Sequence, residues 1–296
     1  MFIQNAQLND EQLTQLDQLC AECKHTDKNI VATYRHLLSK NRNRPANILY
    51  YEYNSAGVRK LAGFLAAFFF SEEVCEITLM ITPTMRRQSV AIGMLKAILP
   101  LIKADGIQQL TFSSPHGLND LWFTTLGLQY QGSEFEMLRT DNKPVIVPTI
   151  SASIRVATDM DISTLCAIDK ACFPSSQIDQ PTRIHRLLND PAYCLFVITQ
   201  DNKIVGKAHL NWLQKTVRLS DIAILPDYQR HGLGTALLAH CINYALAMNQ
   251  FNIVLDVETK NKHALRLYTH LGFSIINAHD YWSIDEFALT AFLQHL

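Results

Sequence analysis

The sequence lacks any apolar run long enough to span a membrane. Its longest such run, Leu61–Phe70, has ten residues, whereas a transmembrane helix needs about 20. We expect this run to form a buried strand. The N-terminus has neither a basic start nor an apolar core, so it does not predict a secretory signal peptide. Both absences predict a cytoplasmic protein with no membrane partner, although export without such a peptide stays open.

An excess of one charge sign is also missing. The chain has 26 lysines and arginines against 27 aspartates and glutamates, which gives a net charge of -1. A balance this close to zero provides no general attraction to nucleic acid or anionic lipid. We therefore expect no nucleic-acid partner, and any anion site must be local.

Paired cysteines are missing as well. The seven cysteines are an odd number without disulfide spacing, which is typical of free thiols in a reducing compartment. Cys20 and Cys23 form a C-x-x-C with His25 nearby, but no second ligand pair completes a zinc site. We expect no metal, and we interpret both residues as ordinary helix cysteines.

The length of 296 residues predicts two domains. A segment with two prolines and little periodicity predicts a linker at 141–152, between a domain at 1–140 and one at 153–296. In the second stretch we expect strands at Ile154–Ala157, Tyr193–Thr199, Ile204–Trp212, Val217–Ile224 and Phe251–Val257, helices from Asp159 to before Pro174 and at Pro181–Leu188, Gly234–Met248 and His263–Leu271, and a pair of short strands within Phe273–Ile284.

The first stretch shows the same order of elements with weaker signals. Pro83 and Pro226 lie 143 residues apart, as do Ala91 and Gly234, which indicates a duplicated fold. Here we expect helices at Asn9–Cys23, Lys28–Ser39, Val90–Lys103 and Leu118–Leu126, strands at Ile48–Tyr53, Lys60–Phe70, Val74–Ile81 and Gln109–Ser113, and a closing strand pair.

The most informative stretch is LSDIAILPDYQRHGLGTALL, from Leu219 to Leu238. An apolar strand runs into a proline, then into Gly232 and Gly234, and then directly into a helix. Glycine lets the backbone approach a bound group, and the free N–H groups of a helix start bind anions such as a pyrophosphate. Arg230 adds a cation beside them. A lone G-x-G would more often be an ordinary helix start.

The residues around these glycines decide between the two interpretations. Gln229-x-x-Gly232-x-Gly234 after a strand and a proline resembles the acetyl-CoA loop of the GNAT (Gcn5-related N-acetyltransferase) superfamily, and it lacks the third glycine of a dinucleotide fingerprint. A second block, LDVETKNKHALRLYTHLGF from Leu255 to Phe273, resembles the same family. The resemblance covers Ile154 to about Ile284. It implies an α/β (α+β) fold class: two tandem GNAT folds, each a mixed, mostly antiparallel twisted sheet flanked by helices, with two splayed central strands.

The resemblance also implies roles for single residues. The backbone of the strand end should pair with pantetheine, the loop should surround the pyrophosphate, Asn261 should hydrogen-bond the pantetheine arm, and Tyr268 should protonate the leaving sulfur. The implied acetyl-CoA contacts are Ile222, Ala223, Ile224, Gln229, Arg230, His231, Gly232, Leu233, Gly234, Thr235, Asn261 and Tyr268.

Amine acetylation also needs a base, because an amine with a pKa near 10.4 is almost entirely protonated at neutral pH. Three carboxylates are candidates: Asp221, Asp256 and Glu258. Asp256 matches the position where similar N-terminal-amine acetyltransferases carry a glutamate. Since aspartate is shorter, a water could bridge it to the amine. Each carboxylate taken alone is more often structural than catalytic.

The first copy departs from the pattern. Ser89 and Ala91 replace the two glycines, and Phe123 stands in place of Tyr268 and has no hydroxyl group. Arg86 and Arg87 could still hold a phosphate. We interpret this domain as a pseudo-enzyme that shapes the acceptor cleft or docks a protein partner.

Two functions from different classes follow. The first is an acetyl-CoA-dependent N-acetyltransferase, of bacterial type by its tandem arrangement, whose acceptor is a small amine, an amino sugar or a protein amine. The second is an acetyl-CoA-binding module whose main role is partner recognition. No loop in the sequence identifies the acceptor.

Overall fold

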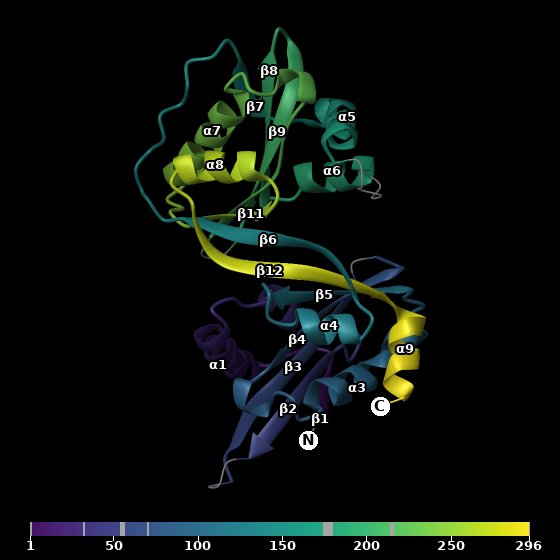
Figure 1. Cartoon of the computed structure of the whole chain (residues 1–296). Coiled ribbons are helices and arrows are strands. Elements are labelled where there is room, and N and C mark those ends of the chain that lie inside the picture. The colour runs from purple at the N-terminus through teal and green to yellow at the C-terminus, as the bar shows by residue number, and fades with distance from the viewer. Residues whose placement is uncertain are drawn as a thin grey trace. The chain divides into compact units, whose positions relative to one another are not determined.

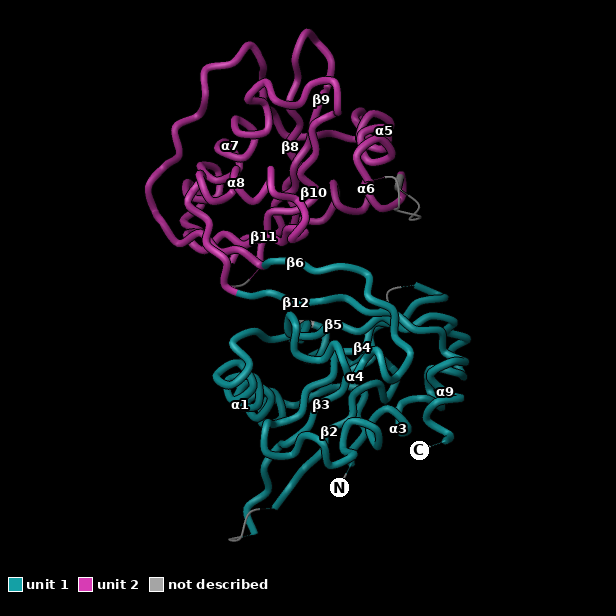
Figure 2. The backbone as a smooth tube through the Cα atoms, viewed as in Figure 1, with its two compact units in different colours: residues 1–135, 277–296 teal, residues 136–276 magenta. Residues whose placement is uncertain are grey.

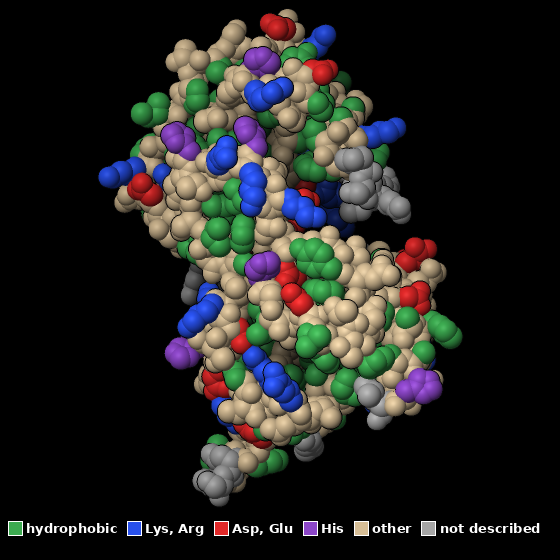
Figure 3. Space-filling model, viewed as in Figure 1, with side chains coloured by type: hydrophobic (Ala, Val, Ile, Leu, Met, Phe, Trp, Pro, Cys, Tyr) green, Lys and Arg blue, Asp and Glu red, His purple; other side chains and the backbone are tan. Residues whose placement is uncertain are grey.

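The computed structural model describes residues 2–31, 33–53, 57–69, 71–173, 180–213 and 216–295. The chain forms two compact units (Figure 2): unit 1 comprises residues 1–135 and 277–296, and unit 2 comprises residues 136–276. Basic and acidic side chains are interspersed on the face shown in Figure 3. No described helix is both long enough and apolar enough to cross a bilayer.

Unit 1 is built on a sheet with the strand order β1-β2-β3-β4-β5-β12, in which only β4 and β5 pair in parallel. Helix α1 covers one face, and α3, α4 and α9 cover the other (Figure 1). The elements are β1 Phe2–Asn5, α1 Asp10–Asp27, α2 Arg35–Leu38, β2 Asn47–Tyr53, β3 Arg59–Phe69, β4 Val74–Ile81, α3 Val90–Ala104, β5 Gln109–Pro115, α4 Asp120–Thr125, β6 Gln129–Arg139, β12 Ser274–Asp285 and α9 Glu286–Gln294.

Unit 2 has a sheet with the order β11-β10-β9-β8-β7, in which only β10 and β11 pair in parallel. Helices α5 and α6 lie on one side of this sheet, and α7 and α8 lie on the other (Figure 1). The elements are β7 Ser153–Val156, α5 Ile162–Cys172, α6 Gln180–Leu188, β8 Tyr193–Gln200, β9 Lys203–Trp212, β10 Val217–Ile224, α7 Leu233–Ala247, β11 Ile253–Glu258 and α8 Lys262–His270. The predicted fold class, mixed and mostly antiparallel sheets flanked by helices, is confirmed.

The internal repeat is visible at the level of whole elements. Strand β10 begins and ends 143 residues after β4, and helix α7 begins and ends 143 residues after α3. A 3-10 turn connects each strand to its helix, at Pro83–Met85 in unit 1 and at Pro226–Tyr228 in unit 2. The strand–turn–helix segment that the sequence singled out is therefore present in both units.

One predicted helix is wrong. In place of a helix at Lys28–Ser39, the described residues of this range contain only the four-residue α2 at its end. Lys28 and Tyr34 both adopt left-handed backbone conformations, with φ of 69° and 44°, and a left-handed residue ends a helix. Tertiary contacts determine the path between them, because the side-chain amide of Asn277 bonds both the N–H and the carbonyl oxygen of Ile30.

The predicted pair of short strands within Phe273–Ile284 is also wrong. The segment is one 12-residue strand, β12, and it pairs antiparallel with β5 of unit 1 from His279–Pro115 to Asp285–Gln109. The strand pair expected to close the first stretch is likewise a single strand, β6. Strand β1 and helix α9 were not predicted. By contact, residues 136–139 of β6 belong to unit 2, and residues 277–285 of β12 belong to unit 1.

Three further predictions concern the apolar run, the linker and the two cysteines of the C-x-x-C. The apolar run forms β3 from Leu61 onward, with Leu61 1% exposed, while its last residue, Phe70, lies outside the described residues, as does Pro174. Residues 140–152 contain no helix or strand, and the predicted linker and domain boundaries stay predictions. Cys20 and Cys23 lie on α1, where burial raises the pKa of their thiols to about 12 and about 11.

Candidate functional site

The site predicted from the sequence begins where two parallel strands of unit 2 separate. The register of β10 with β11 covers only Val217–Ile253 and Arg218–Val254. Farther along, Ala223 and Ile224 pair with Lys207 and Gly206 of β9, on the opposite edge of β10. Apart from the carbonyl oxygen of Ile224, which accepts from Gln229, the edge of Ile222–Ile224 that faces away from β9 can therefore offer backbone groups to the amides of a pantetheine arm.

A bulge in β10 lies at the start of this segment. The register with β9 shifts between Ser220 and Ala223, and Asp221 has a φ of 49°. A left-handed conformation costs a residue other than glycine about 1–2 kcal/mol, so the surrounding structure must hold it. The corresponding strand of unit 1, β4, keeps a continuous register with β3 through Thr78, the counterpart of Asp221.

The side chain of Asp221 is held by two partners, Arg183 of α6 and His209 of β9. The Arg183 guanidinium bonds one carboxylate oxygen, and Nδ1 of His209 lies 3.0 Å from the same oxygen. Burial lowers the pKa of His209, which is 1% exposed. Burial alone would raise the pKa of Asp221, but the contacts with His209 and Arg183 and the nearby charge of Lys207 hold it well below its ordinary value.

A second ion pair lies beneath this one. Lys207, on β9, has a fully buried side chain and contacts the carboxylate of Asp169, on α5. Buried charges without partners are costly, so the two groups depend on each other. Together with Arg183, His209 and Asp221 they form what we call the bulge network. Asp221 is thus held by charged and polar partners, and a role for it as the base stays a prediction.

The loop after β10 has the geometry of an anion site. Arg230 has a φ of 65°, and Gly232, with a φ of 79°, is the N-cap of α7 and makes no side-chain cap. The first N–H groups of a helix have no intrahelical partners, so those of Leu233, Gly234 and Thr235 are available to a diphosphate. A Cβ at Gly234 would meet only ordinary contacts, the nearest being Ile224 at 3.7 Å. These residues therefore fit the phosphates of acetyl-CoA.

The side chains of the loop divide by role. Leu233 is 2% exposed and belongs to the core, so it can offer only its backbone, and Thr235 is half-buried. Arg230 and His231 are exposed and can reach a ligand. Gln229 donates from Nε2 to the carbonyl oxygen of Ile224 over 2.9 Å, which fixes the loop against the strand end.

Helix α8 carries two predicted residues. Asn261 is its N-cap and accepts from the N–H of Ala264 over 3.0 Å, so its amide N–H groups are the part left for the predicted contact with pantetheine. Tyr268 is 7% exposed, and its ring packs edge-on against Phe273 with the centroids 6.0 Å apart. Burial raises the pKa of Tyr268 to about 12, so the phenol keeps its proton at neutral pH and can donate it.

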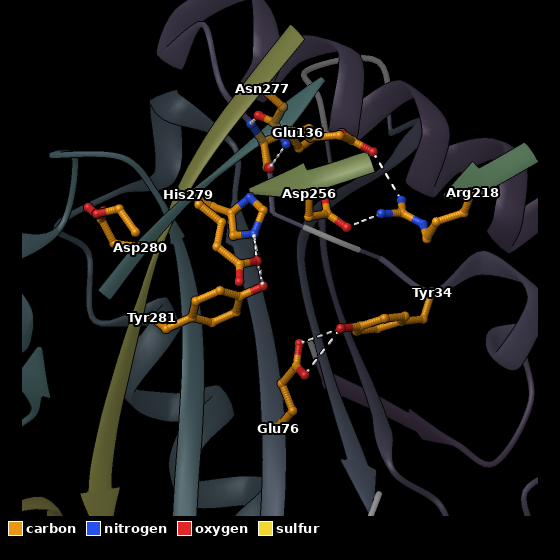
Figure 4. Close-up of polar contacts among 12 residues, drawn as sticks. Tyr34, Glu76, Glu136, Arg218, Asp256, Asn277, His279, Asp280 and Tyr281 are labelled. Atoms are coloured by element: carbon orange, nitrogen blue, oxygen red, sulfur yellow. Dashed lines mark hydrogen bonds and ion pairs between the residues drawn. The ribbon is translucent and has the colours of Figure 1, made fainter. Parts of the chain in front are cut away.

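The two remaining carboxylates lie on β11. Asp256 and Glu258 alternate with buried residues, so both point from the same, exposed face of the strand. Arg218 of β10 contacts Asp256 through Nη1 and lies 3.2 Å from Glu136 of β6 through Nη2 (Figure 4). Glu258 makes a different contact, since its carbonyl oxygen accepts from the N–H of Asn261 over 2.9 Å. The described residues contain no group of three or more side chains suited to a metal ion.

Sequence reasoning missed Arg218, Glu136, Arg183 and His209. Arg218 and Glu136 are 82 residues apart in the chain, and only the folded chain brings them together. A signal was available for His209 and Lys207, which are polar residues at two-residue spacing in the mostly apolar middle of the strand.

The corresponding loop of unit 1 has a similar backbone conformation. Arg87 and Ser89 have φ of 60° and 59°, close to Arg230 and Gly232, and Ser89 is the N-cap of α3. Arg86, which could have held a phosphate, is already engaged. Its guanidinium bonds both carboxylate oxygens of Asp27, at 2.7 and 2.6 Å, and the carbonyl oxygen of Ile81 at 3.1 Å.

The segment that contains these residues is similar to known proteins. The family model described as "Acetyltransferase (GNAT) family" matches residues 162–273. Those residues are a GNAT acetyltransferase domain. The chain is 38% identical over 82 residues to the [ribosomal protein bS18]-alanine N-acetyltransferase of Escherichia coli (strain K12), a match that covers 28% of this chain and 55% of the relative. It thus spans about half the length of that relative.

Solved structures match the whole chain at the level of fold. A GCN5-related N-acetyltransferase from Sphaerobacter thermophilus has a TM-score of 0.75 at 15% identity, with 96% of each chain covered. A tandem GNAT protein from the clavulanic acid biosynthesis pathway has a TM-score of 0.66 at 14% identity, with 97% of this chain and 98% of that chain covered. Residues 162–273 therefore lie in a chain whose fold is similar to that of a tandem GNAT protein.

Proposed function

We propose that unit 2 catalyses the transfer of an acetyl group from acetyl-CoA to a primary amine. The observation that carries this proposal is the separation of β10 from β11 directly before an uncapped α7, with Gly232 in a left-handed conformation at its start. One ligand can then pair its amides with the β10 edge and place its diphosphate on the helix N-terminus.

When bound, acetyl-CoA supplies an activated thioester. Around it the chain provides a strand N–H near Ala223 for the developing oxyanion and the neutral phenol of Tyr268 for the leaving sulfur. Asp256 is the proposed base, either directly or through a water, and Arg218 and Glu136 fix the position of its carboxylate. The bulge network holds the backbone that aims the N–H groups of β10.

For the acceptor, we propose the α-amine of a protein or peptide that begins with alanine. The support is the similarity over 82 residues to an enzyme named for alanine N-acetylation of a ribosomal protein. An α-amine also has a pKa of about 8, so far more of it is neutral at pH 7 than of a lysine side chain. A weaker base is then enough for an α-amine. Asp256, whose carboxylate is ion-paired with Arg218, can therefore serve as that base.

The test is thiol release from acetyl-CoA with an alanine-initiated peptide, its N-terminally blocked form and a peptide with a single lysine. The proposal expects release with the free α-amine and at most weak release with the other two. Binding of acetyl-CoA without release for any of a broad amine panel would instead favour the alternative, a cofactor-binding recognition module.

A further inference from the structure

Unit 1 contains a cavity of about 820 Å³ that lies outside the residues matched by the family model. This volume is within the range of small-molecule sites, about 300–1,000 Å³. Its walls come from the end of α1 and the segment after it, from β4, β5 and α4, and from the loop before α3 together with the start of that helix. They are mostly apolar, with Met80, Val90, Trp122 and Phe123 among them, and the charged residues Asp27, Arg86 and Arg87 line the cavity as well. A ligand of this cavity must therefore carry an apolar portion.

At one wall of the cavity a polar group lacks a partner. Ser113 of β5 is 5% exposed, and its Oγ makes no hydrogen bond within the described part of the chain. Buried hydroxyl groups are nearly always hydrogen-bonded, because an unmade bond costs free energy. A ligand in the cavity can supply the missing bond.

The face of the sheet that carries Ser113 continues into a set of titratable side chains. Ser113 is the direct register partner of Tyr281 on β12, and directly paired residues point to the same face. The Tyr281 hydroxyl donates to Oε2 of Glu134 over 3.1 Å, and Nε2 of His279 lies 2.9 Å from the same hydroxyl (Figure 4). Nδ1 of His279, a residue 7% exposed, has no partner among the described residues.

Glu76 of β4 completes the set. Its two carboxylate oxygens accept from the hydroxyl of Tyr34 at 3.0 and 3.2 Å (Figure 4). Burial raises the pKa of this half-buried carboxyl, although the bond from Tyr34 and the nearby imidazole of His279 act in the opposite direction. No lysine or arginine is paired with it in the part of the chain that the structure describes. A partly buried carboxylate without a cation is costly, and a bound cation relieves that cost.

The register places this carboxylate on the same face as the cavity wall. Glu76 pairs with Thr111 on β5, two residues before Ser113, and Thr111 pairs in turn with Ser283 on β12. Met80, four residues after Glu76 on β4, lines the cavity. Apolar space and hydrogen-bond acceptors thus follow one another along a single sheet face.

We infer that unit 1 holds a second ligand site, which takes a primary ammonium group at Glu76 and an apolar arm in the cavity. An ammonium offers three donors and no acceptor, which matches carboxylate and phenol oxygens. An anionic head is disfavoured at this end because Glu76 and Glu134 would repel it. The site is independent of the loop of unit 2, and its ligand binds there without an acetyl donor.

The probe for this site is n-hexylammonium, compared with n-hexanol, which has the same apolar arm without the charge. The chain has three tryptophans, Trp122, Trp212 and Trp282. In the Trp212→Phe protein both remaining tryptophans belong to unit 1, and Trp122 lines the cavity. Tryptophan fluorescence of this protein, excited at a wavelength that tyrosine does not absorb and without any coenzyme A, therefore reports on unit 1 alone, so failure here leaves the acetylation assay unaffected.

We expect saturable binding of n-hexylammonium that is at least about tenfold tighter than that of n-hexanol, since a hydrogen bond to a charged group contributes about that much. Glu76→Gln keeps an acceptor for Tyr34 and removes the charge, so it should lose this preference. The exposed Glu72→Gln, in the turn before β4, should keep it. Equal binding of the two probes to the parent protein would overturn the inference, as would no saturable response or an unchanged preference in Glu76→Gln.

Discussion

Gln229 donates from Nε2 to the carbonyl oxygen of Ile224 over 2.9 Å, and Arg86 donates from Nε to the carbonyl oxygen of Ile81 over 3.1 Å at the same place in the other unit. The two copies thus fix the loop after the strand in one way, with different side chains. Gln229 is neutral, whereas the charge of Arg86 is balanced by Asp27. The copies keep a common loop backbone, and they differ in the charge and in the glycine content around it.

The left-handed glycine of unit 2 can be tested against a matched glycine elsewhere. Gly232→Ala and Gly106→Ala both place a Cβ on a residue with φ above 70°, and neither Cβ meets a close contact. Both should lose about 1–2 kcal/mol of stability, measured by urea unfolding. Gly232→Ala alone should weaken coenzyme A binding, by at least about tenfold in calorimetry. An equal loss of affinity in both variants would show that the effect is general destabilisation.

Tyr268→Phe tests the proposed acid. The change removes one hydroxyl and leaves the ring contact with Phe273 in place, so the protein should fold and bind coenzyme A as before. Loss of a general acid typically lowers turnover about 100-fold or more, so kcat should fall while the affinity for acetyl-CoA stays within about twofold. Unchanged kcat would remove Tyr268 from the chemistry.

Two substitutions on the exposed face of β11 test which carboxylate is the base. Asp256→Asn should lower kcat by about 100-fold or more, because the carboxylate held by Arg218 is lost as a proton acceptor. Glu258→Gln, two residues along, serves as the comparison and should change kcat by only a few fold. If Glu258→Gln were the more damaging variant in steady-state thiol release, the assignment would move to that residue.

The bulge network predicts a pH dependence of stability. The pKa of Asp221 is depressed in the folded state, so its ionised form stabilises the fold at pH values above its unfolded pKa of about 4. That contribution is lost as the pH falls below about 4 towards the folded pKa. Asp221→Asn should therefore unfold at a lower temperature than the parent protein at pH 7, and the difference should shrink as the pH falls. A difference that is the same at pH 7 and pH 3 would contradict this role.

Local sequence patterns predicted the parts of unit 2 whose structure is determined locally. The bounds of β10, Val217–Ile224, were predicted correctly, and α7 begins one residue before the prediction. Alternating apolar residues, a proline and two glycines leave little choice there. The prediction at Lys28–Ser39 failed because that segment takes its conformation from contacts with β12, about 250 residues away.

In the candidate site, too, the local motifs could be predicted from the sequence, whereas the contacts between distant segments could not. The glycine loop and Tyr268 are contiguous motifs that the sequence displays directly. The partners that hold Asp256 and Asp221 come from β6, β9, β10 and α6, and no spacing rule connects those segments. Likewise, only the pairing of β12 with β5 places Tyr281 beside Ser113. Sequence motifs therefore predict the loop that is proposed to bind the cofactor. Only the tertiary fold shows which charged side chains surround it.

Recognition of the coenzyme A diphosphate by the start of α7 is central to the proposed function. Calorimetry with coenzyme A and with pantetheine, which has the same arm but no diphosphate, tests this on the unmodified chain. We predict that coenzyme A binds at least about 100-fold more tightly, because several charge-assisted hydrogen bonds are made only with the diphosphate. Equal affinities for the two compounds, or no heat with either, would contradict the account.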